Sequence, residues 1–236
     1  MRPIVVTGCP RADLALVGEL ASFGVATVHE AIGRSGYLGP TIRPVHPGAR
    51  VGGTAVTAVC WPGDNLMVHA AVEQCRAGDI LVVTTTSPSA DGLFGELLGT
   101  ALRHRGVRAL VTTGGVRDIA ALHDMGFPVF SRAVSAQGTV KATAGAVNVG
   151  VSIDGQRIEP GDAVVADDDG VVVVPRAEVR AALAAARDRA AKEDAARESF
   201  AAGELSLDRY GLRAVLSRLG VEYLDYESYL ERDAGR

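Results

Sequence analysis

The N-terminal third of the chain contains short amphipathic segments separated by glycine-rich turns. Apolar residues recur at helical spacing between Ala12 and Phe23, and a glycine follows. A second short helix is expected to begin at Thr27, a residue type that caps helices, and to end at Gly33. Residues 34–50 are rich in Gly, Pro and Arg and predict an ordered loop. The β-branched run Thr54–Cys60 predicts a strand.

Between residues 62 and 124, apolar strands and amphipathic helices alternate. Turn residues with Gly and Asp separate these segments, and Asp64 is placed to cap the first helix. The expected elements are the helix Leu66–Cys75, the strand Ile80–Thr85, the helix Phe94–His104, the strand Val107–Thr112 and the helix Asp118–His123. This alternation predicts an α/β fold with a parallel or mixed sheet layered with helices.

Residues 128–175 contain short apolar runs and few helix signals. The expected strands are Pro128–Phe130, Ala146–Ile153, Ala163–Ala166 and Val171–Val174. Asp154-Gly155 predicts a hairpin turn. The acidic run 167–169 followed by a glycine lies between two valine-rich strands, so a hairpin turn is favoured over a calcium loop.

Beyond Pro175 the sequence becomes helical. A long helix rich in Ala, Arg and Glu is expected over Ala177–Ala202, and a shorter amphipathic helix over Ser206–Leu219. We therefore predict one α/β domain over residues 1–202. A helical C-terminal arm over residues 203–236 would follow it and would not be an independent domain.

Composition narrows the function classes. The 236 residues are 47% hydrophobic, which is enough for a full core, and the net charge of −4 gives no broad basic surface for nucleic acid. No apolar run approaches the ~20 residues of a membrane span. Three widely spaced cysteines support neither a disulfide framework nor a zinc site, and are expected to be buried thiols. We expect a cytoplasmic protein that binds neither nucleic acid nor a membrane.

The segment from Gly95 to Asp118 carries the residues best suited to chemistry. Residues 95–98 begin a predicted helix, where free backbone N–H groups favour a carboxylate and a glycine permits close approach. Gly114-Gly115 follow a strand, at a sheet edge where α/β proteins commonly bind ligands. Arg117 offers donors to an anion, and Asp118 offers an oxygen ligand to a divalent cation. The alternative is a structural turn in which Asp118 caps its helix.

This segment resembles the core of the RraA-like family, which includes metal-dependent 4-hydroxy-4-methyl-2-oxoglutarate / 4-carboxy-4-hydroxy-2-oxoadipate aldolases. The family motif is an acidic residue, twenty intervening residues and Arg-Asp; Glu96, Leu97–Val116 and Arg117-Asp118 match it. Many members carry an acidic residue where this chain has Ala121. The resemblance extends to GYLGPTIRPVHPGARVGGTAVTAVC at 36–60, PGDNLMVHAA at 62–71, AGDILVV at 77–83, PGDAVVADDDGVVVVP at 160–175 and AAGELSLDRYGLRAVLSRLGVEYLD at 201–225, the last typical of the aldolase branch.

The resemblance implies a swivelling β/β/α sandwich that assembles as a homotrimer or a dimer of trimers. It implies retro-aldol cleavage of a 4-hydroxy-2-oxo acid to pyruvate and a second 2-oxo acid, with oxaloacetate decarboxylation as a side activity. Asp118 would hold Mg²⁺ or Mn²⁺, partly through waters. Gly95 and the backbone N–H groups of Leu97 and Leu98 would receive the pyruvyl carboxylate, and Arg117 would stabilise the enolate oxygen.

The same resemblance assigns two acidic residues to proton transfer. Glu96 would hold a water, and an acidic residue from a neighbouring subunit's C-terminal arm would join it, with Glu193 as the candidate and Glu198 as the fallback. A lysine imine is the rival mechanism. The chain has only two lysines, Lys141 in a polar loop and Lys192 in a charged helix, which favours the metal. The alternative function is a non-catalytic regulator that binds an endoribonuclease.

Overall fold

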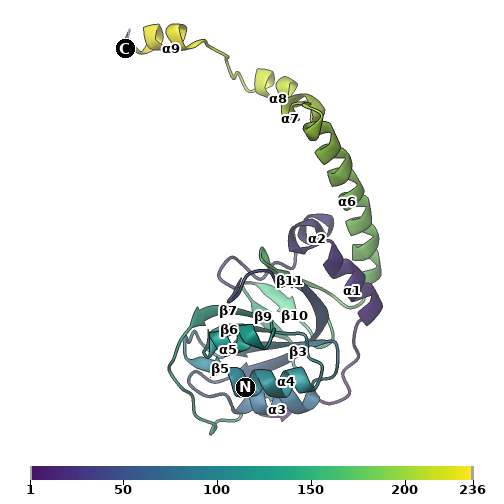
Figure 1. The fold of residues 1–236 in the computed structure, drawn as a ribbon, viewed down its shortest axis with the longest axis vertical. Coiled ribbons are helices and arrows are strands. Elements are labelled where there is room, and N and C mark those ends of the chain that lie inside the picture. Colours follow the sequence, from purple (N-terminus) through teal and green to yellow (C-terminus); the bar gives the residue numbers. More distant parts are fainter. Residues whose placement is uncertain (1, 235–236) are drawn as a thin grey trace. The chain divides into compact units, whose positions relative to one another are not determined.

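The computed structural model describes the backbone of residues 2–234, and the chain forms two compact units. The first is Met1–Ala190 and the second is Ala191–Arg236, so the division falls inside the long helix α6 (Val179–Ala201) (Figure 1). The boundary predicted between residues 202 and 203 lies at the end of that helix. Among the described residues, no helix combines the length and the apolarity that a membrane crossing needs.

The first unit is built on a ten-stranded mixed sheet. Four neighbouring strands, β3, β4, β6 and β7, run parallel in its centre. The strand order is β1 (Ile4–Val5), β8 (Ala146–Val147), β3 (Val51–Cys60), β4 (Asp79–Thr85), β6 (Ala109–Val116), β7 (Val129–Val134) and β2 (Arg43–Pro44). The hairpin β11 (Ala163–Asp167) and β12 (Gly170–Val174) pairs with β3, and β5 (Gly92–Phe94) pairs with β6.

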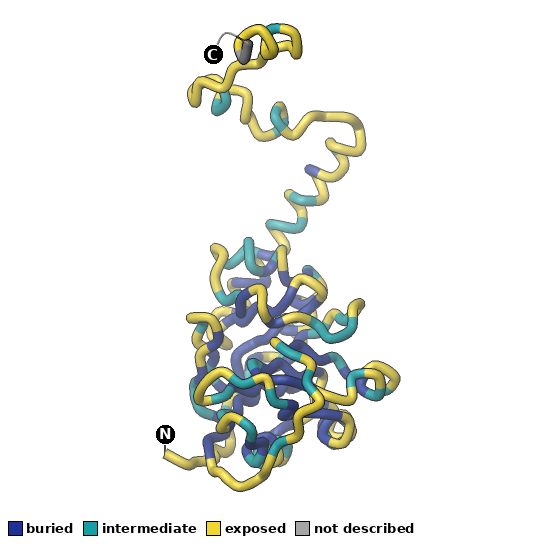
Figure 2. Tube along the Cα trace, turned by 90° about the vertical axis from the view of Figure 1, so that its left-hand side faces the viewer, coloured by how far each residue is buried: buried dark blue, intermediate teal, exposed yellow. Residues whose placement is uncertain are grey.

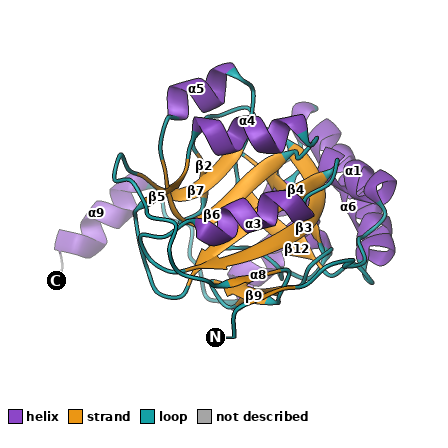
Figure 3. Cartoon of the chain, turned by 90° about the horizontal axis from the view of Figure 1, so that it is seen from below, coloured by secondary structure: helices purple, strands orange, loops and turns teal. Residues whose placement is uncertain are grey.

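Layers cover both faces of the central strands, which explains their nearly continuous burial. One face carries α3 (Leu66–Gln74), α4 (Glu96–His104) and α5 (Ile119–Asp124), and Figure 3 shows α3 and α4 lying across it. The other face packs against the small sheet of β9 (Val151–Ile153) and β10 (Gln156–Ile158). The first helices, α1 (Leu14–Ser22) and α2 (Val25–Ala31), cover β11 and β12 together with the start of α6. Figure 2 shows the buried residues, in dark blue, gathered in the interior of the compact part of the trace. The predicted α/β class is confirmed.

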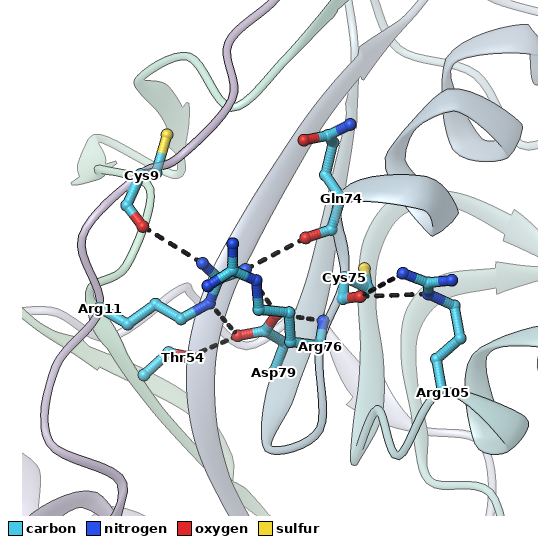
Figure 4. Close-up of polar contacts among 8 residues, drawn as sticks. All are labelled: Cys9, Arg11, Thr54, Gln74, Cys75, Arg76, Asp79 and Arg105. Atoms are coloured by element: carbon cyan, nitrogen blue, oxygen red, sulfur yellow. Dashed lines mark hydrogen bonds and ion pairs between the residues drawn. The ribbon is translucent and has the colours of Figure 1, made fainter.

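A buried ion pair fixes the segment before α1 to the beginning of β4 (Figure 4). The Asp79 carboxylate, which is inaccessible to solvent, accepts hydrogen bonds from Arg11 Nε at 2.7 Å and Arg11 Nη2 at 2.8 Å. It also accepts from the Thr54 hydroxyl at 2.6 Å and from the Arg76 backbone N–H at 2.7 Å. The Asp79 carboxylate therefore joins three parts of the unit: the segment before α1, strand β3 and the turn that precedes β4.

Several predicted boundaries are wrong, each for an identifiable reason. The second helix begins at Val25, not after Thr27, because Gly24 turns the chain at φ 82° and Asp167 Oδ2 accepts from the Val25 N–H at 2.8 Å. The predicted strand 146–153 divides into β8 and β9 because Asn148 is left-handed at φ 55°. The acidic run 167–169 forms the turn of the β11–β12 hairpin, as predicted.

The second unit continues α6 into three short helices with mostly exposed side chains. Gly211, at φ 63°, divides the single helix predicted over Ser206–Leu219 into α7 (Ser206–Arg209) and α8 (Leu212–Arg218). The helix α9 (Tyr226–Ala234) was not predicted. Large exposed apolar side chains in this unit include Leu205, Tyr210, Leu219, Tyr223, Tyr226 and Tyr229.

Candidate active site

The N-terminus of α4 presents unpaired backbone donors. Gly95 precedes the helix in an extended conformation and has no side chain of its own to cap this end. Within residues 2–234, the backbone N–H groups of Leu97 and Leu98 donate to no protein acceptor. Leu97 itself is 82% exposed, whereas Leu98 packs into the core. This helix end therefore offers two free amide groups and the positive end of the helix dipole to an anion.

Asp118 lies against the same helix end. Its Oδ2 atom accepts a hydrogen bond from the Glu96 backbone N–H at 3.2 Å, 22 residues away in the sequence. The residue is left-handed, at φ 56° and ψ 35°, which is unusual for a side chain other than glycine and is typical of constrained functional positions. Asp118 occupies the residue before α5, but its side chain does not cap that helix. The capping of α5 by the Asp118 side chain, which the structural alternative assumed, is therefore wrong.

Gly95 makes the approach of Asp118 possible. A Cβ atom at this position would lie 2.4 Å from Asp118 Oδ2 and 3.0 Å from Arg117 Cγ. The backbone angles of Gly95 suit any residue, since both are near 180°. Glycine is thus needed here for space and not for its conformational freedom.

We expect Gly95→Ala to lower kcat/KM for the reaction proposed below about tenfold to a hundredfold. The added methyl group must displace the Asp118 carboxylate. The melting temperature should change little, since the backbone conformation suits alanine. Gly18→Ala is the matched control: Gly18 lies in α1 with open space around it, and its φ is not positive. Equal activities of the two variants, measured by steady-state kinetics, would contradict the assigned role of Gly95.

Arg117 places a half-exposed guanidinium beside Asp118. The distance from Arg117 Nε to Asp118 Oδ2 is 3.6 Å, and the two side chains are 46% and 43% exposed. The Arg117 backbone N–H donates to the Phe94 carbonyl at 2.9 Å, which ties it to the end of β5. A Cβ atom at Gly138 would lie 3.4 Å from Arg117 Nη1, so the loop after β7 borders the guanidinium. Arg117 is therefore a solvent-accessible donor next to the carboxylate and close to the α4 end.

Gly114 and Gly115 contact the segment that leads into α4. The register between β6 and β7 shifts between Thr112 and Gly115. A Cβ atom at Gly115 would lie 2.1 Å from the Ala90 carbonyl oxygen, and one at Gly114 would lie 2.4 Å from a Leu93 methyl group. These glycines let the segment before α4 lie closely alongside β6, with which β5 pairs in parallel.

Asp64 holds the loop that borders Arg117, a role that sequence reasoning missed. Asp64 is buried, and its Oδ2 atom accepts from the backbone N–H groups of Ala142 at 2.8 Å and Thr143 at 2.6 Å. Burial raises the pKa of this carboxyl, but the hydrogen bonds from Leu66, Ala142 and Thr143 outweigh it, and the pKa is lowered overall. Next to it, the Asn65 side chain donates to the Leu93 carbonyl at 2.9 Å. A polar residue before a predicted helix is normally interpreted as a cap, so a long-range role is not visible from sequence.

The structure thus brings together the predicted residues Gly95, Glu96, Leu97, Leu98, Arg117 and Asp118 in the first unit. Glu193 lies on α6 in the second unit, and its predicted role in a neighbouring subunit's site stays a prediction. Among the described residues, no three His, Cys, Asp or Glu side chains gather as a metal cluster. The cysteines are free: Cys60 and Cys75 are buried, and burial raises the pKa of each thiol to about 12, whereas Cys9 is half-buried.

Comparison with known proteins identifies relatives over most of the chain. A Halalkalibacterium halodurans protein, provisionally named a 4-hydroxy-4-methyl-2-oxoglutarate aldolase, is 26% identical over 85% of this chain and 95% of its own. A Burkholderia multivorans protein with the same provisional name is 36% identical over 65% of this chain and 94% of its own. The solved structure of Streptomyces coelicolor RraAS2, described as an unusual member of the RNase ES inhibitor RraA protein family, superposes with a TM-score of 0.70. It is 28% identical, covering 80% of this chain and all of that chain.

A sequence model of the RraA-like family, described as Aldolase/RraA, matches residues 25–173. The match runs from the beginning of α2 into β12 and contains every residue of the candidate site in the first unit. The sequence match and the shared fold agree with the resemblance of the 95–118 segment. The chain belongs to the RraA-like family of aldolase and RraA proteins.

Proposed function

We propose that the protein is a divalent-metal-dependent aldolase that cleaves 4-hydroxy-2-oxo acids to pyruvate and a second 2-oxo acid. The candidate substrates are 4-carboxy-4-hydroxy-2-oxoadipate and 4-hydroxy-4-methyl-2-oxoglutarate. The observation that carries the proposal is the Asp118 carboxylate held against the open N-terminus of α4, with Arg117 beside it. The provisional names of the Halalkalibacterium and Burkholderia relatives support the same reaction class.

The residues present fit a Mg²⁺ or Mn²⁺ ion. Asp118 is half-exposed, and its Oδ1 atom accepts no hydrogen bond within the described part of the chain, so one carboxylate oxygen is available. Mg²⁺ characteristically binds through one or two carboxylates and keeps several waters. When bound, the ion would act as a Lewis acid toward the 2-oxo acid.

The protein's own groups would bind and stabilise the rest of the substrate. The N–H groups of Leu97 and Leu98 would receive the carboxylate next to the 2-oxo group. Cleavage of the C3–C4 bond sends its electron pair toward the C2 oxygen, where the Arg117 guanidinium would stabilise the developing charge. Glu96, exposed in the first turn of α4, would hold the water that takes the proton from the C4 hydroxyl. Decarboxylation of oxaloacetate needs the same stabilisation and would be a side activity.

We further propose that the protein works as a homotrimer or a dimer of trimers, with Glu193 of one subunit completing the site of another. The exposed apolar side chains of the second unit support burial against another copy. The binding partners would then be a small 2-oxo acid and the protein itself, without nucleic acid or membrane. A cytoplasmic location accords with the three free thiols.

A second candidate function is regulation of an endoribonuclease without catalysis. The structural similarity to the Streptomyces coelicolor protein, whose description names an RNase ES inhibitor family, favours it. The accessible donors at the α4 end and the half-exposed Arg117 and Asp118 side chains favour catalysis, because they form an open anion and cation site.

The test is pyruvate release from 4-carboxy-4-hydroxy-2-oxoadipate, followed with lactate dehydrogenase. With Mg²⁺ we expect turnover, and with excess EDTA we expect it to fall to background and to return when Mg²⁺ or Mn²⁺ is restored. Borohydride should trap no substrate adduct, because the two lysines are not part of the site. Activity that survives EDTA and is trapped by borohydride would indicate a lysine imine. No pyruvate under any condition would contradict the aldolase and favour the regulator.

A further inference from the structure

A separate polar cavity lies at the carboxyl ends of the parallel strands. It has a volume of about 580 Å³, within the range of small-molecule sites. Its lining comprises residues 84–90, which end β4 and follow it, Thr113 of β6, Arg132 and Ala133 of β7, and residues 152–154 of β9 and the next turn. None of these is a residue of the candidate active site. Ligands of α/β proteins commonly bind outside the carboxyl ends of the strands, and this cavity lies in that position.

An ordered ion pair forms one wall of the cavity. Arg132 Nη2 donates to Asp154 Oδ1, and both side chains are about one-third exposed, at 32% and 33%. Asp154 is left-handed, with φ 46°, and a Cβ atom at Gly39 would lie 2.0 Å from its Oδ2 atom. The carboxylate is thus held tightly between the hairpin turn and the segment at Gly39. Its partner guanidinium is held in place, and Arg132 Nε and Nη1 donate to no acceptor in residues 2–234.

Unpaired hydroxyl groups form much of the remaining lining. Thr84 is only 6% exposed, and its hydroxyl makes no hydrogen bond with the described part of the chain. The same holds for the hydroxyls of Thr85, Thr86, Ser87 and Ser152. These hydroxyl groups open into the cavity and are available to donate to or accept from a bound ligand.

We propose that this cavity is a second binding site, for a small hydroxylated carboxylate. The free donors of Arg132 suit a carboxylate, for which guanidinium is the preferred partner. The Asp154 carboxylate and the threonine and serine hydroxyls suit ligand hydroxyls. The ion pair leaves the wall with no net charge, which does not suit a polyanion such as a nucleoside diphosphate. Ala133 and Ile153 supply apolar contacts for a short carbon chain.

Isothermal titration with D-gluconate and D-sorbitol tests the proposal, because the two probes differ only in the group at C1. We expect gluconate to bind at least about tenfold more tightly than sorbitol, the contribution of one charge-assisted contact. Arg132→Met should weaken gluconate binding about tenfold or more, with Arg132→Lys retaining part of it, and Thr84→Val should weaken it severalfold. Asp118→Asn should leave it unchanged, since Asp118 is not part of the cavity.

Arg157→Met is the matched control, because Arg157 is an exposed arginine of β10 that is paired with Glu159. It should bind gluconate as the wild type does. Should Arg132→Met fail to fold, Arg132→Lys and Thr84→Val carry the comparison, with melting temperatures as the check on folding. Three outcomes would overturn the proposal: no gluconate binding up to on the order of 10 mM, equal affinity for sorbitol, or loss of binding in Asp118→Asn. None of these readouts depends on aldolase activity, so failure of either proposal can be told from failure of the other.

Discussion

Asp118→Asn is expected to lower kcat/KM for pyruvate release by about 1000-fold. Asparagine keeps the size of the side chain and an oxygen that can accept from the Glu96 N–H, but it lacks the charge that a divalent cation requires. Lewis-acid stabilisation is worth several kcal/mol, and each 1.4 kcal/mol corresponds to tenfold in rate. Steady-state kinetics at saturating Mg²⁺ measures the loss, and titration with Mn²⁺ measures whether cation affinity falls with it.

Asp124→Asn is the control for this substitution. Asp124 ends α5, six positions after Asp118, and it is exposed. The change of charge is identical, so any general electrostatic effect should be equal in the two variants. Because the Asp118 side chain makes a single 3.2 Å hydrogen bond and is half-exposed, both variants should melt close to the wild type. Retention of activity within tenfold of the wild type by Asp118→Asn would remove Asp118 from the mechanism.

The sequence allowed prediction of those parts of the fold that depend on local periodicity. The alternation of β4, α4, β6 and α5 was predicted because each element carries its own apolar spacing and its own turn residues. The short strands β1 and β5 were not predicted, because two or three residues carry no period. They exist through pairing with β8 and β6 respectively. The beginning of α2 was misplaced for a similar reason, since its capping carboxylate comes from Asp167, 142 residues later.

The candidate site was predictable in its residues but not in its geometry. The spacing between Glu96 and Arg117-Asp118 marks the segment, and the structure places the two ends within hydrogen-bond distance. Two properties were not visible. One is the left-handed backbone of Asp118, which turns its carboxylate toward α4 and away from capping α5. The other is the steric need for Gly95, which arises only when that carboxylate is in place.

Asp79→Ala is expected to lower the free energy of unfolding by about 3–5 kcal/mol. The substitution leaves the Arg11 guanidinium, only 17% exposed, without its carboxylate, and it removes the acceptor for the Thr54 hydroxyl and the Arg76 N–H (Figure 4). Removing one partner of a buried ion pair costs that amount because the remaining charge is uncompensated. Urea denaturation followed by circular dichroism measures the loss, and the melting temperature should fall by on the order of 10 °C.

Glu159→Ala serves as the control, because it breaks an exposed ion pair. The Arg157 side chain is 69% exposed and the Glu159 side chain is 42% exposed. Its effect should be below about 1 kcal/mol, because exposed pairs are solvated and screened. The variant Arg11→Met with Asp79→Leu should be more stable than Asp79→Ala alone, since no charge is then left unpaired. If Asp79→Ala were no less stable than Glu159→Ala, the buried pair would not hold the segment before α1 to the sheet. We attribute the loss in the free energy of unfolding to the Arg11 guanidinium, which is left buried without a carboxylate. The double variant tests this, because it removes the attraction between the two side chains without leaving a buried charge unpaired.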